Sequence, residues 1–286
     1  MRLPSWLRTH RRVGETFLKV HGLLRRNRLD TVCRSAACPN RTECWSAGTA
    51  TFLLLGPVCT RRCGFCSIPK GEPAGVDHDE PERIAATAGR MRLSYVVLTS
   101  VTRDDLPDGG AGHFQRTIEA VRRASPGCRV EVLIPDLQGS AKALDTVLSA
   151  LPDVLNHNME TVPSLYERVR PQADYQRSLE LLSRAKHLGF RTKSGIMLGL
   201  GEQGSEVRTV LQDLRMSGCD ILTIGQYLQP SRTMLPVQRY VHPDEFVVLR
   251  REALAMGFQS VVAGPLARSS YHAEETAGPR MGQGEQ

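Results

Sequence analysis

Short hydrophobic runs recur along the chain after residue 50, and each is followed by a longer amphipathic stretch. The runs predict buried strands, at 51–56, 95–100, 129–135, 153–158, 191–198 and 221–227. The amphipathic stretches predict helices, at 81–90, 112–124, 140–150, 173–188, 205–217 and 243–256. Strands that alternate with helices favour a parallel sheet covered by helices. The pattern therefore predicts an α/β fold built from six strand–helix units.

Residues at the ends of several predicted helices support these boundaries. Asp79 and Ser140 precede two of them, where a side-chain oxygen can accept a hydrogen bond from a free backbone N–H group. Gly189 and Gly218 follow two others, and glycine readily adopts the left-handed conformation that ends a helix. The polar, Gly-rich tail at 276–286 is expected to be disordered.

Composition excludes several classes of protein. The chain has 286 residues, 41% of them hydrophobic, which suffices for one large domain or two small ones, and no apolar run has membrane-spanning length. The basic residues 1–12 lack the apolar core of a signal peptide. The net charge is +7, but only 5% of residues are aromatic, which disfavours nucleic acid binding. We expect a cytoplasmic protein whose basic surface is either solvated or attracts an acidic partner.

Six of the eight cysteines form two groups of three. The first triad has the spacing C-x4-C-x5-C and consists of Cys33, Cys38 and Cys44. The second triad has the spacing C-x3-C-x2-C and consists of Cys59, Cys63 and Cys66. Zinc binds four ligands, whereas three cysteines on one loop anchor three irons of a cubane cluster and leave the fourth open. An iron–sulfur cluster is favoured over zinc or a redox thiol loop for the second triad, and both interpretations stay open for the first.

The second triad, with Phe65 before its last cysteine, resembles the signature of the radical S-adenosylmethionine (SAM) superfamily. With the first triad upstream, the chain resembles lipoyl synthases from Trp6 to Glu275, through the motifs TVCRSAACPNRTECW, SVTRDDLPDGGAGHF, NHNMETVPSLYERVRP, SGIMLGLGE, DILTIGQYLQPS and RSSYHAE. The resemblance implies SAM and two [4Fe–4S] clusters as cofactors, in a partial (β/α)6 barrel. It also implies an N-terminal extension at 1–50, a barrel at 51–260 and a C-terminal segment at 261–286 that returns to the first triad.

Polar side chains lie on or after several predicted strands, and the mouth of such a barrel would lie where the strands end. These residues are Thr99, Ser100, Asp104, Asn156, Asn158, Glu160, Lys193, Ser194, Glu202, Gln226 and Tyr227. The resemblance implies a SAM site that comprises Asn158, Glu160, Gly195, Met197, Gly199 and Tyr227. Outside this set, Cys128, Cys219 and His157 are expected to be structural.

The first triad lacks a fourth ligand, and the resemblance implies one from the motif R-S-S-Y. It is the hydroxyl of Ser270, with Ser269 beside it. A hydroxyl is a rarer iron ligand than a thiolate, but it can be protonated and leave, which would free its iron during sulfur transfer. Arg34 is the one visible departure, because an acidic residue is expected there in the family.

The resemblance implies insertion of two sulfur atoms, at C6 and C8, into an octanoyl chain on a lysine of a lipoyl carrier domain. Such domains belong to the E2 subunits of 2-oxoacid dehydrogenases and to the glycine cleavage H protein. Because these C–H bonds carry no acidic proton, a radical is required. The second-triad cluster would cleave SAM with an electron from reduced ferredoxin or flavodoxin, and the first-triad cluster would donate sulfur.

Two other functions stay open. One is a different radical SAM enzyme that inserts sulfur into, or transfers methylthio groups to, a small molecule or tRNA. The other is an iron–sulfur electron carrier without radical chemistry. The polar residues at the strand ends disfavour the carrier, and almost no chain is expected outside the barrel for an appended RNA-binding domain.

Overall fold

The computed structural model of the chain describes residues 2–8, 14–36, 38–46 and 51–278. Its eight-stranded sheet has the order β1 to β8, in which β2 to β8 are parallel and β1 is antiparallel to β2. The strands are β1 (Asp30–Thr31), β2 (Thr51–Leu54), β3 (Tyr95–Ser100), β4 (Arg129–Leu133), β5 (Val154–Asn156), β6 (Thr192–Leu198), β7 (Ile221–Gln226) and β8 (Ser260–Gly264). Residues 279–286, most of the tail expected to be disordered, lie outside the described part.

One long helix follows each strand from β2 to β7. These helices are α4 (Glu80–Met91), α5 (Ala111–Ala124), α6 (Ala141–Ser149), α8 (Tyr175–His187), α9 (Gly204–Met216) and α10 (Pro243–Ala255). The shorter helices and 3-10 turns are η1 (Ser5–Leu7), α1 (Glu15–Arg26), α2 (Val32–Ser35), α3 (Arg41–Ser46), η2 (Leu137–Gly139), η3 (Pro163–Leu165), α7 (Tyr166–Val169) and α11 (Ala273–Thr276). All six predicted strand–helix units are confirmed, with small changes at their ends.

Two strands were not predicted. In β8, only Val261 is buried, and the strand ends in glycine, so its hydrophobic signal is short. Strand β1 has two residues, too few for a recognisable alternation. The α/β partial barrel is confirmed, but it has one more parallel strand than the six expected. No ladder joins β8 to β1 among the described residues, so the ring of strands is open on that side.

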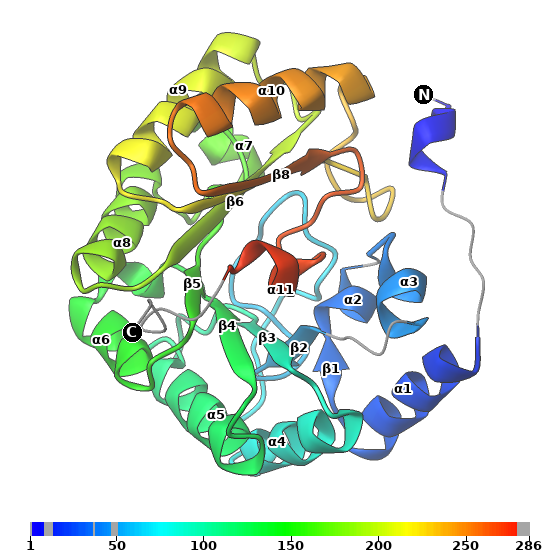
Figure 1. The fold of residues 1–286 in the computed structure, drawn as a ribbon, viewed down its shortest axis with the longest axis vertical. Helices are drawn as coiled ribbons and strands as arrows, with labels where there is room; N and C mark the ends of the chain where they lie inside the picture. Colours follow the sequence, from blue (N-terminus) through cyan, green and yellow to red (C-terminus); the bar gives the residue numbers. More distant parts are fainter. Residues whose placement is uncertain (1, 9–13, 37, 47–50, 279–286) are drawn as a thin grey trace, which may run out of the picture.

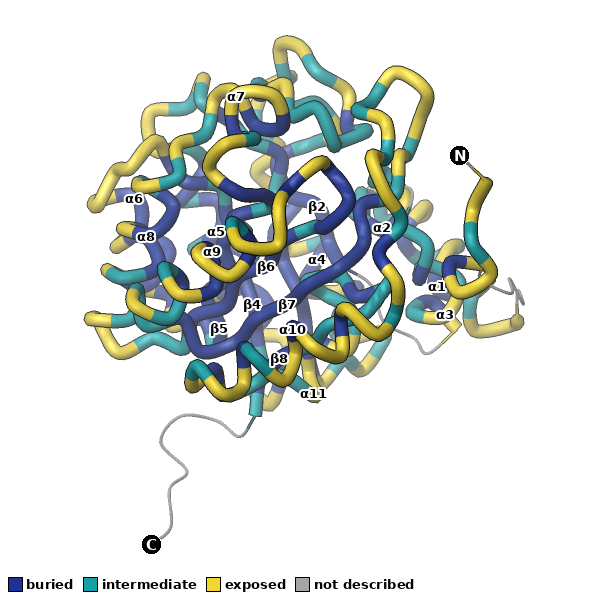
Figure 2. The backbone as a smooth tube through the Cα atoms, turned by 90° about the horizontal axis from the view of Figure 1, so that it is seen from above, coloured by how far each residue is buried: buried dark blue, intermediate teal, exposed yellow. Residues whose placement is uncertain are grey.

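The long helices surround the strands, and α2, α3 and α11 lie by the gap between β8 and β1 (Figure 1). Figure 2 shows the strands as the buried centre of the molecule. Phe52 of β2 and Leu98 of β3 share a core cluster with Phe114 and Ile118 of α5. Fully burying such a side chain contributes about 1.5–3 kcal/mol, so this layer fixes the strands whose ends carry the site.

Three of the four predicted helix-capping residues cap their helices as expected. The Ser140 hydroxyl accepts a hydrogen bond from the N–H of Ala143, and Gly189 and Gly218 have φ angles of 88° and 81°. Asp79 stands at the N-cap of α4, but its side chain makes no capping hydrogen bond. In the described residues, no helix is both long and apolar enough to cross a bilayer.

Candidate active site

The second triad lies on the loop between β2 and α4, beside the segment that follows β3. The sulfur of Cys59 accepts hydrogen bonds from the backbone N–H groups of Arg61, at 3.4 Å, and Thr102, at 3.3 Å. Burial raises the pKa of the Cys63 thiol to about 11 and also raises that of Cys66. A metal binds the thiolate, so iron bound here would release these protons.

Glu160 follows the carboxyl end of β5 and lies close to the second triad. Its carboxylate raises the pKa of both Cys63 and Cys66, and burial in turn raises the pKa of Glu160. The amide of Asn158 donates a hydrogen bond to Glu160 at 3.1 Å. Arg170 opposes the burial effect through its positive charge. The predicted residues Asn158 and Glu160 are therefore hydrogen-bonded to each other and lie, partly buried, beside the cysteine loop.

An apolar cluster joins the cysteine loop to the ends of β6 and β7. Phe65 and Met197 pack there against a cluster that contains the buried side chain of Tyr227. The Tyr227 hydroxyl donates to the backbone oxygen of Leu235 at 2.7 Å, and burial raises its pKa to about 12. This apolar cluster lies close to Cys66, whose charge also raises the pKa of Tyr227.

Gly199 and Glu202 shape the turn after β6. The Glu202 carboxylate accepts hydrogen bonds from the backbone N–H groups of Gly199, Leu200 and Gly201, at 2.6, 2.9 and 3.1 Å. Gly199 has a φ of 99°, and a Cβ there would lie 2.3 Å from the Gln226 amide. Glu202 thus supports the turn, while Gly199 provides the space it needs.

Glycines on β6 and β7 let the C-terminal segment enter the ring of strands. A Cβ on Gly195 would lie 3.0 Å from the Asn158 amide oxygen and 3.2 Å from the Ser269 hydroxyl. A Cβ on Gly225 would lie 2.2 Å from the backbone oxygen of Ala267. Ser269 donates a hydrogen bond to Asn158 at 2.9 Å. The segment before Ser270 therefore packs closely against β6 and β7.

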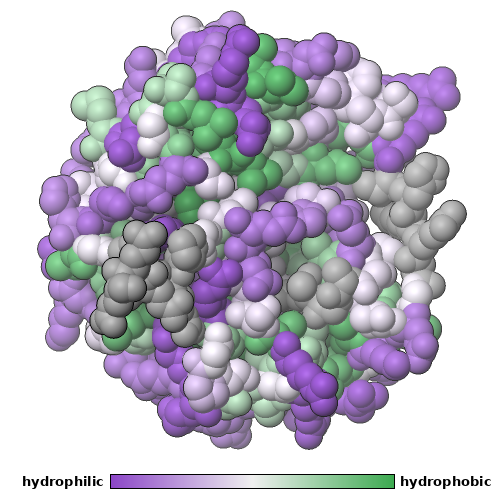
Figure 3. Space-filling model, in the orientation of Figure 1, coloured by the Kyte–Doolittle hydropathy of each residue, from purple (hydrophilic) through white to green (hydrophobic). Residues whose placement is uncertain are grey.

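The first triad and Ser270 line one pocket of about 430 Å³, at the open side of the sheet. Figure 3 shows the surface hollowed next to α11. Cys33 is buried, and burial raises its pKa, whereas the nearby backbone of Thr51 lowers it. Asn40 donates to the backbone oxygen of Leu266 at 2.8 Å, which ties the N-terminal region to the C-terminal segment.

The donor set at this pocket is compatible with an iron–sulfur cluster. The described residues contain no group of three His, Cys, Asp or Glu side chains arranged to hold one metal ion. Tetrahedral zinc with bonds of about 2.3 Å brings its sulfurs to about 3.8 Å from each other. A cubane cluster instead spreads its ligands over separate irons. Three thiols and a hydroxyl around one cavity fit that arrangement.

Arg268 interacts electrostatically with residues near both triads. The charges of Cys38, in the first triad, and Glu160, beside the second, both act on its guanidinium, while burial lowers its pKa. Arg268 therefore lies close enough to both Cys38 and Glu160 for each charge to act on it. Sequence reasoning missed this residue, although it opens the R-S-S-Y motif.

A buried ion pair inside the barrel was also missed. The Lys193 ammonium lies 3.0 Å from the Glu131 carboxylate, and both side chains are almost completely buried. Tyr95 donates to Glu131 at 2.7 Å and Asn156 at 3.0 Å. The signal available in the sequence was a glutamate inside the otherwise apolar run at 129–135.

Other candidates are structural, as expected. His157 is buried, and its ring nitrogens lie 2.8 Å from the Ile134 backbone oxygen and 3.0 Å from the Ser178 hydroxyl. Cys128 and Cys219 are buried in the core. Arg34 pairs with Asp30 at 3.0 Å on the surface.

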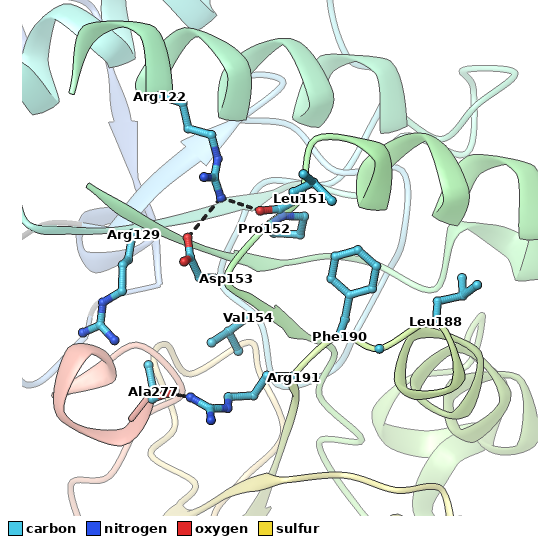
Figure 4. Close-up of a pocket in the computed structure, with 11 residues that line it drawn as sticks. Arg122, Arg129, Leu151, Pro152, Asp153, Val154, Leu188, Phe190, Arg191 and Ala277 are labelled. Carbon is cyan, nitrogen blue, oxygen red and sulfur yellow. Dashed lines mark hydrogen bonds and ion pairs between the residues drawn. The ribbon is translucent and has the colours of Figure 1, made fainter. Parts of the chain in front are cut away.

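A pocket of about 460 Å³ at the amino ends of β4 to β6 anchors the C-terminal segment (Figure 4). Arg191 donates to the backbone oxygen of Ala277, and Arg129 donates to that of Gly278. Arg122 is held by Asp153 at 3.1 Å. This pocket holds the end of the segment that carries Ser270.

Residues 53–214 match the model of the radical SAM superfamily, which spans more than half of the chain. A lipoyl synthase from Chlorobium limicola is 56% identical over 280 residues, which cover 97% of this chain and 96% of that protein. A lipoyl synthase from Oleidesulfovibrio alaskensis is 55% identical over 273 residues, which cover 96% and 94%.

Solved structures with the same fold have distant sequences. Methylornithine synthase superposes with a TM-score of 0.54 at 15% identity, over 86% of this chain and 82% of its own. The FeFe-hydrogenase maturase from Carboxydothermus hydrogenoformans superposes with a TM-score of 0.58 at 16% identity, over 79% and 64%. At such identities the likeness concerns the fold alone.

Proposed function

The chain belongs to the lipoyl synthase family of the radical SAM superfamily, and we propose that it inserts sulfur at C6 and C8 of an octanoyl chain on a carrier-domain lysine. The observation that carries this proposal is that the charges of Cys38, in the first triad, and of Glu160, beside the second, both act on Arg268. Glu160 lies beside the second triad, and Ser270 shares a pocket with the first. A radical made at one site can then meet a sulfur donor at the other.

The proposed catalytic centre is the second triad, with Cys59, Cys63 and Cys66 holding a [4Fe–4S] cluster. When bound, the cluster supplies the electron that cleaves SAM and so generates the hydrogen-abstracting 5'-deoxyadenosyl radical. The proposed SAM site comprises Asn158, Glu160, Gly195, Met197, Gly199 and Tyr227. Asn158 orients the Glu160 carboxylate. Phe65, Met197 and Tyr227 exclude water, which would otherwise quench or redirect a reactive species.

We assign the sulfur donor to a second [4Fe–4S] cluster, a substrate of the reaction, on Cys33, Cys38, Cys44 and Ser270. An alkoxide ligand is a stronger base than a thiolate, so the Ser270 oxygen can take up a proton and leave its iron. Ser269 binds Asn158 instead, which fixes the backbone that presents Ser270.

The proposed organisation has three parts. Residues 1–50 and 261–286 are extensions that carry the first triad and Ser270, and residues 51–260 form the barrel. Partners are octanoylated domains of 2-oxoacid dehydrogenase E2 subunits and the glycine cleavage H protein, with reduced ferredoxin or flavodoxin as electron donor. We place the protein in the cytoplasm, with neither nucleic acid nor membrane as a partner. The net charge of +7 suits an acidic carrier domain.

The test is anaerobic reconstitution, followed by incubation with SAM, dithionite and an octanoylated H protein. We expect lipoyl carrier, detected by mass, and two 5'-deoxyadenosines per lipoyl group. An electron carrier would form no 5'-deoxyadenosine. A radical SAM enzyme with another substrate would form 5'-deoxyadenosine but leave the carrier unchanged.

A further inference from the structure

Arg61, which lies inside the second-triad loop, joins three loops through buried ion pairs. Its guanidinium makes two hydrogen bonds to Asp104, at 2.6 and 2.9 Å, and one to Asp136 at 2.6 Å. Asp104 follows β3, and Asp136 follows β4. The side chain of Arg61 is 5% exposed and that of Asp136 is fully buried. Burial raises the pKa of Asp136, but Arg61 outweighs it and brings the value to about 2, so the pair stays ionised.

Two of these three loops each direct one backbone N–H group toward Cys59. The N–H of Thr102 and that of Arg61 itself both point at the Cys59 sulfur. Thr60 fixes the relative position of these donors, because its N–H and hydroxyl both donate to the Thr102 backbone oxygen, at 3.1 and 3.0 Å. The N–H of Asp104 donates back to the Thr60 hydroxyl at 3.2 Å. The Arg61 ion pairs and the hydrogen bonds to Cys59 thus belong to one rigid unit.

We propose that Arg61 is a positioning residue, which holds these two N–H groups against the Cys59 sulfur and thereby sets the reduction potential of the catalytic cluster. The inference rests on the proposed function in one respect, namely that the second triad carries the cluster. Hydrogen bonds to a cluster thiolate stabilise the more negative, reduced form and raise the potential. SAM cleavage begins with that reduction, so the ion pairs act on the reaction without touching SAM.

Arg61→Lys separates positioning from charge. Lysine keeps the positive charge but lacks the planar fork that binds both carboxylates at once. If only the charge mattered, this variant would behave as the parent. If the fork positions the loop, the N–H groups drift from Cys59 and the potential falls. Arg184→Lys is the matched control, since Arg184 binds Asp145 through a similar fork at 2.7 Å, on the exposed surface.

The experiment is a redox titration of the reconstituted full-length enzyme, followed by the electron paramagnetic resonance signal that changes when SAM is added. For Arg61→Lys we expect full iron content and about a tenfold smaller reduced-to-oxidised ratio at fixed potential, or about 59 mV for a one-electron couple. Arg184→Lys should titrate as the parent. The proposal is overturned if the two variants titrate alike.

Two further variants keep the outcome decisive. If Arg61→Lys loses iron, the titration is repeated with Asp104→Asn. The Asp104→Asn variant retains the Arg61–Asp136 ion pair, and its potential is compared with that of Arg184→Lys in the same way. In a separate arm, Cys59, Cys63 and Cys66 are all replaced by alanine. Persistence of the SAM-sensitive signal there would refute the cluster assignment itself, which distinguishes that failure from a failure of the role proposed for Arg61.

Discussion

Gly225→Ala tests whether the C-terminal segment must enter the barrel for sulfur insertion. The new Cβ would lie 2.2 Å from the Ala267 backbone oxygen and 3.1 Å from the Arg268 guanidinium. Optimal contacts between heavy atoms are about 3.5 Å, so the backbone near Ala267 must retreat by about 1 Å. Overpacking of this kind costs about 1–3 kcal/mol. Because a tenfold change in an equilibrium corresponds to about 1.4 kcal/mol, the docked segment is disfavoured by about 5- to 150-fold.

Ser270 lies three residues after Ala267, so this displacement withdraws its hydroxyl from the first triad. We expect 5'-deoxyadenosine to form at near the parent rate, while lipoyl product falls by about 5- to 150-fold. The assay is the ratio of lipoyl product to 5'-deoxyadenosine. Gly264→Ala on the neighbouring strand is the control, since a Cβ there meets nothing within 4 Å. A parent ratio in Gly225→Ala would refute the role assigned to the segment.

Three further predictions concern the triads, Ser270 and pH. Replacing Cys59, Cys63 and Cys66 by alanine should leave about four irons and abolish SAM cleavage, whereas replacing Cys33, Cys38 and Cys44 should leave SAM cleavage but no lipoyl product; iron analysis and chromatography of 5'-deoxyadenosine check both. Ser270→Cys should keep both clusters and SAM cleavage but lose sulfur insertion, with Ser269→Ala much milder; lipoyl product at the parent rate from Ser270→Cys would contradict the need for an oxygen ligand. Burial lowers the pKa of His157 to about 4 from 6.5, so the folded state favours its neutral form. That stability is present above pH 6.5 and is lost as pH falls toward 4, by about 3 kcal/mol in total. Urea unfolding of apoprotein at several pH values measures this loss, and a His157→Gln variant with the same pH profile would show that another group is responsible.

The sequence predicted the barrel because most of its strands are buried on both faces. Runs such as 51–54 and 95–100 are almost wholly apolar, and their helices carry clear caps such as Ser140. Strand β8 escaped prediction because it lies at the edge of the sheet and only Val261 is buried. Hydrophobic runs indicate buried strands, and an edge strand has too few buried residues to produce such a run.

The candidate site was predictable where its residues lie close together in the sequence. The second triad lies within eight residues of sequence, and its neighbours Asn158 and Glu160 follow a predicted strand. The packing of Gly195 against Ser269, and of Gly225 against Ala267, depends on contacts between segments far apart in sequence. The fork of Arg61 depends likewise on two loops that only the folded sheet brings together. Periodicity carries no information about such contacts.

The most direct test of the central claim follows the sulfur atoms. The enzyme is reconstituted with ³⁴S-sulfide, freed of unbound sulfide, and mixed with SAM, dithionite and octanoylated H protein for a single turnover. If the first-triad cluster is the donor, mass spectrometry will find two ³⁴S atoms in each lipoyl group, and Cys33, Cys38 and Cys44 replaced by alanine will yield none. Lipoyl product that carries unlabelled sulfur, or that forms without the first triad, would contradict the account.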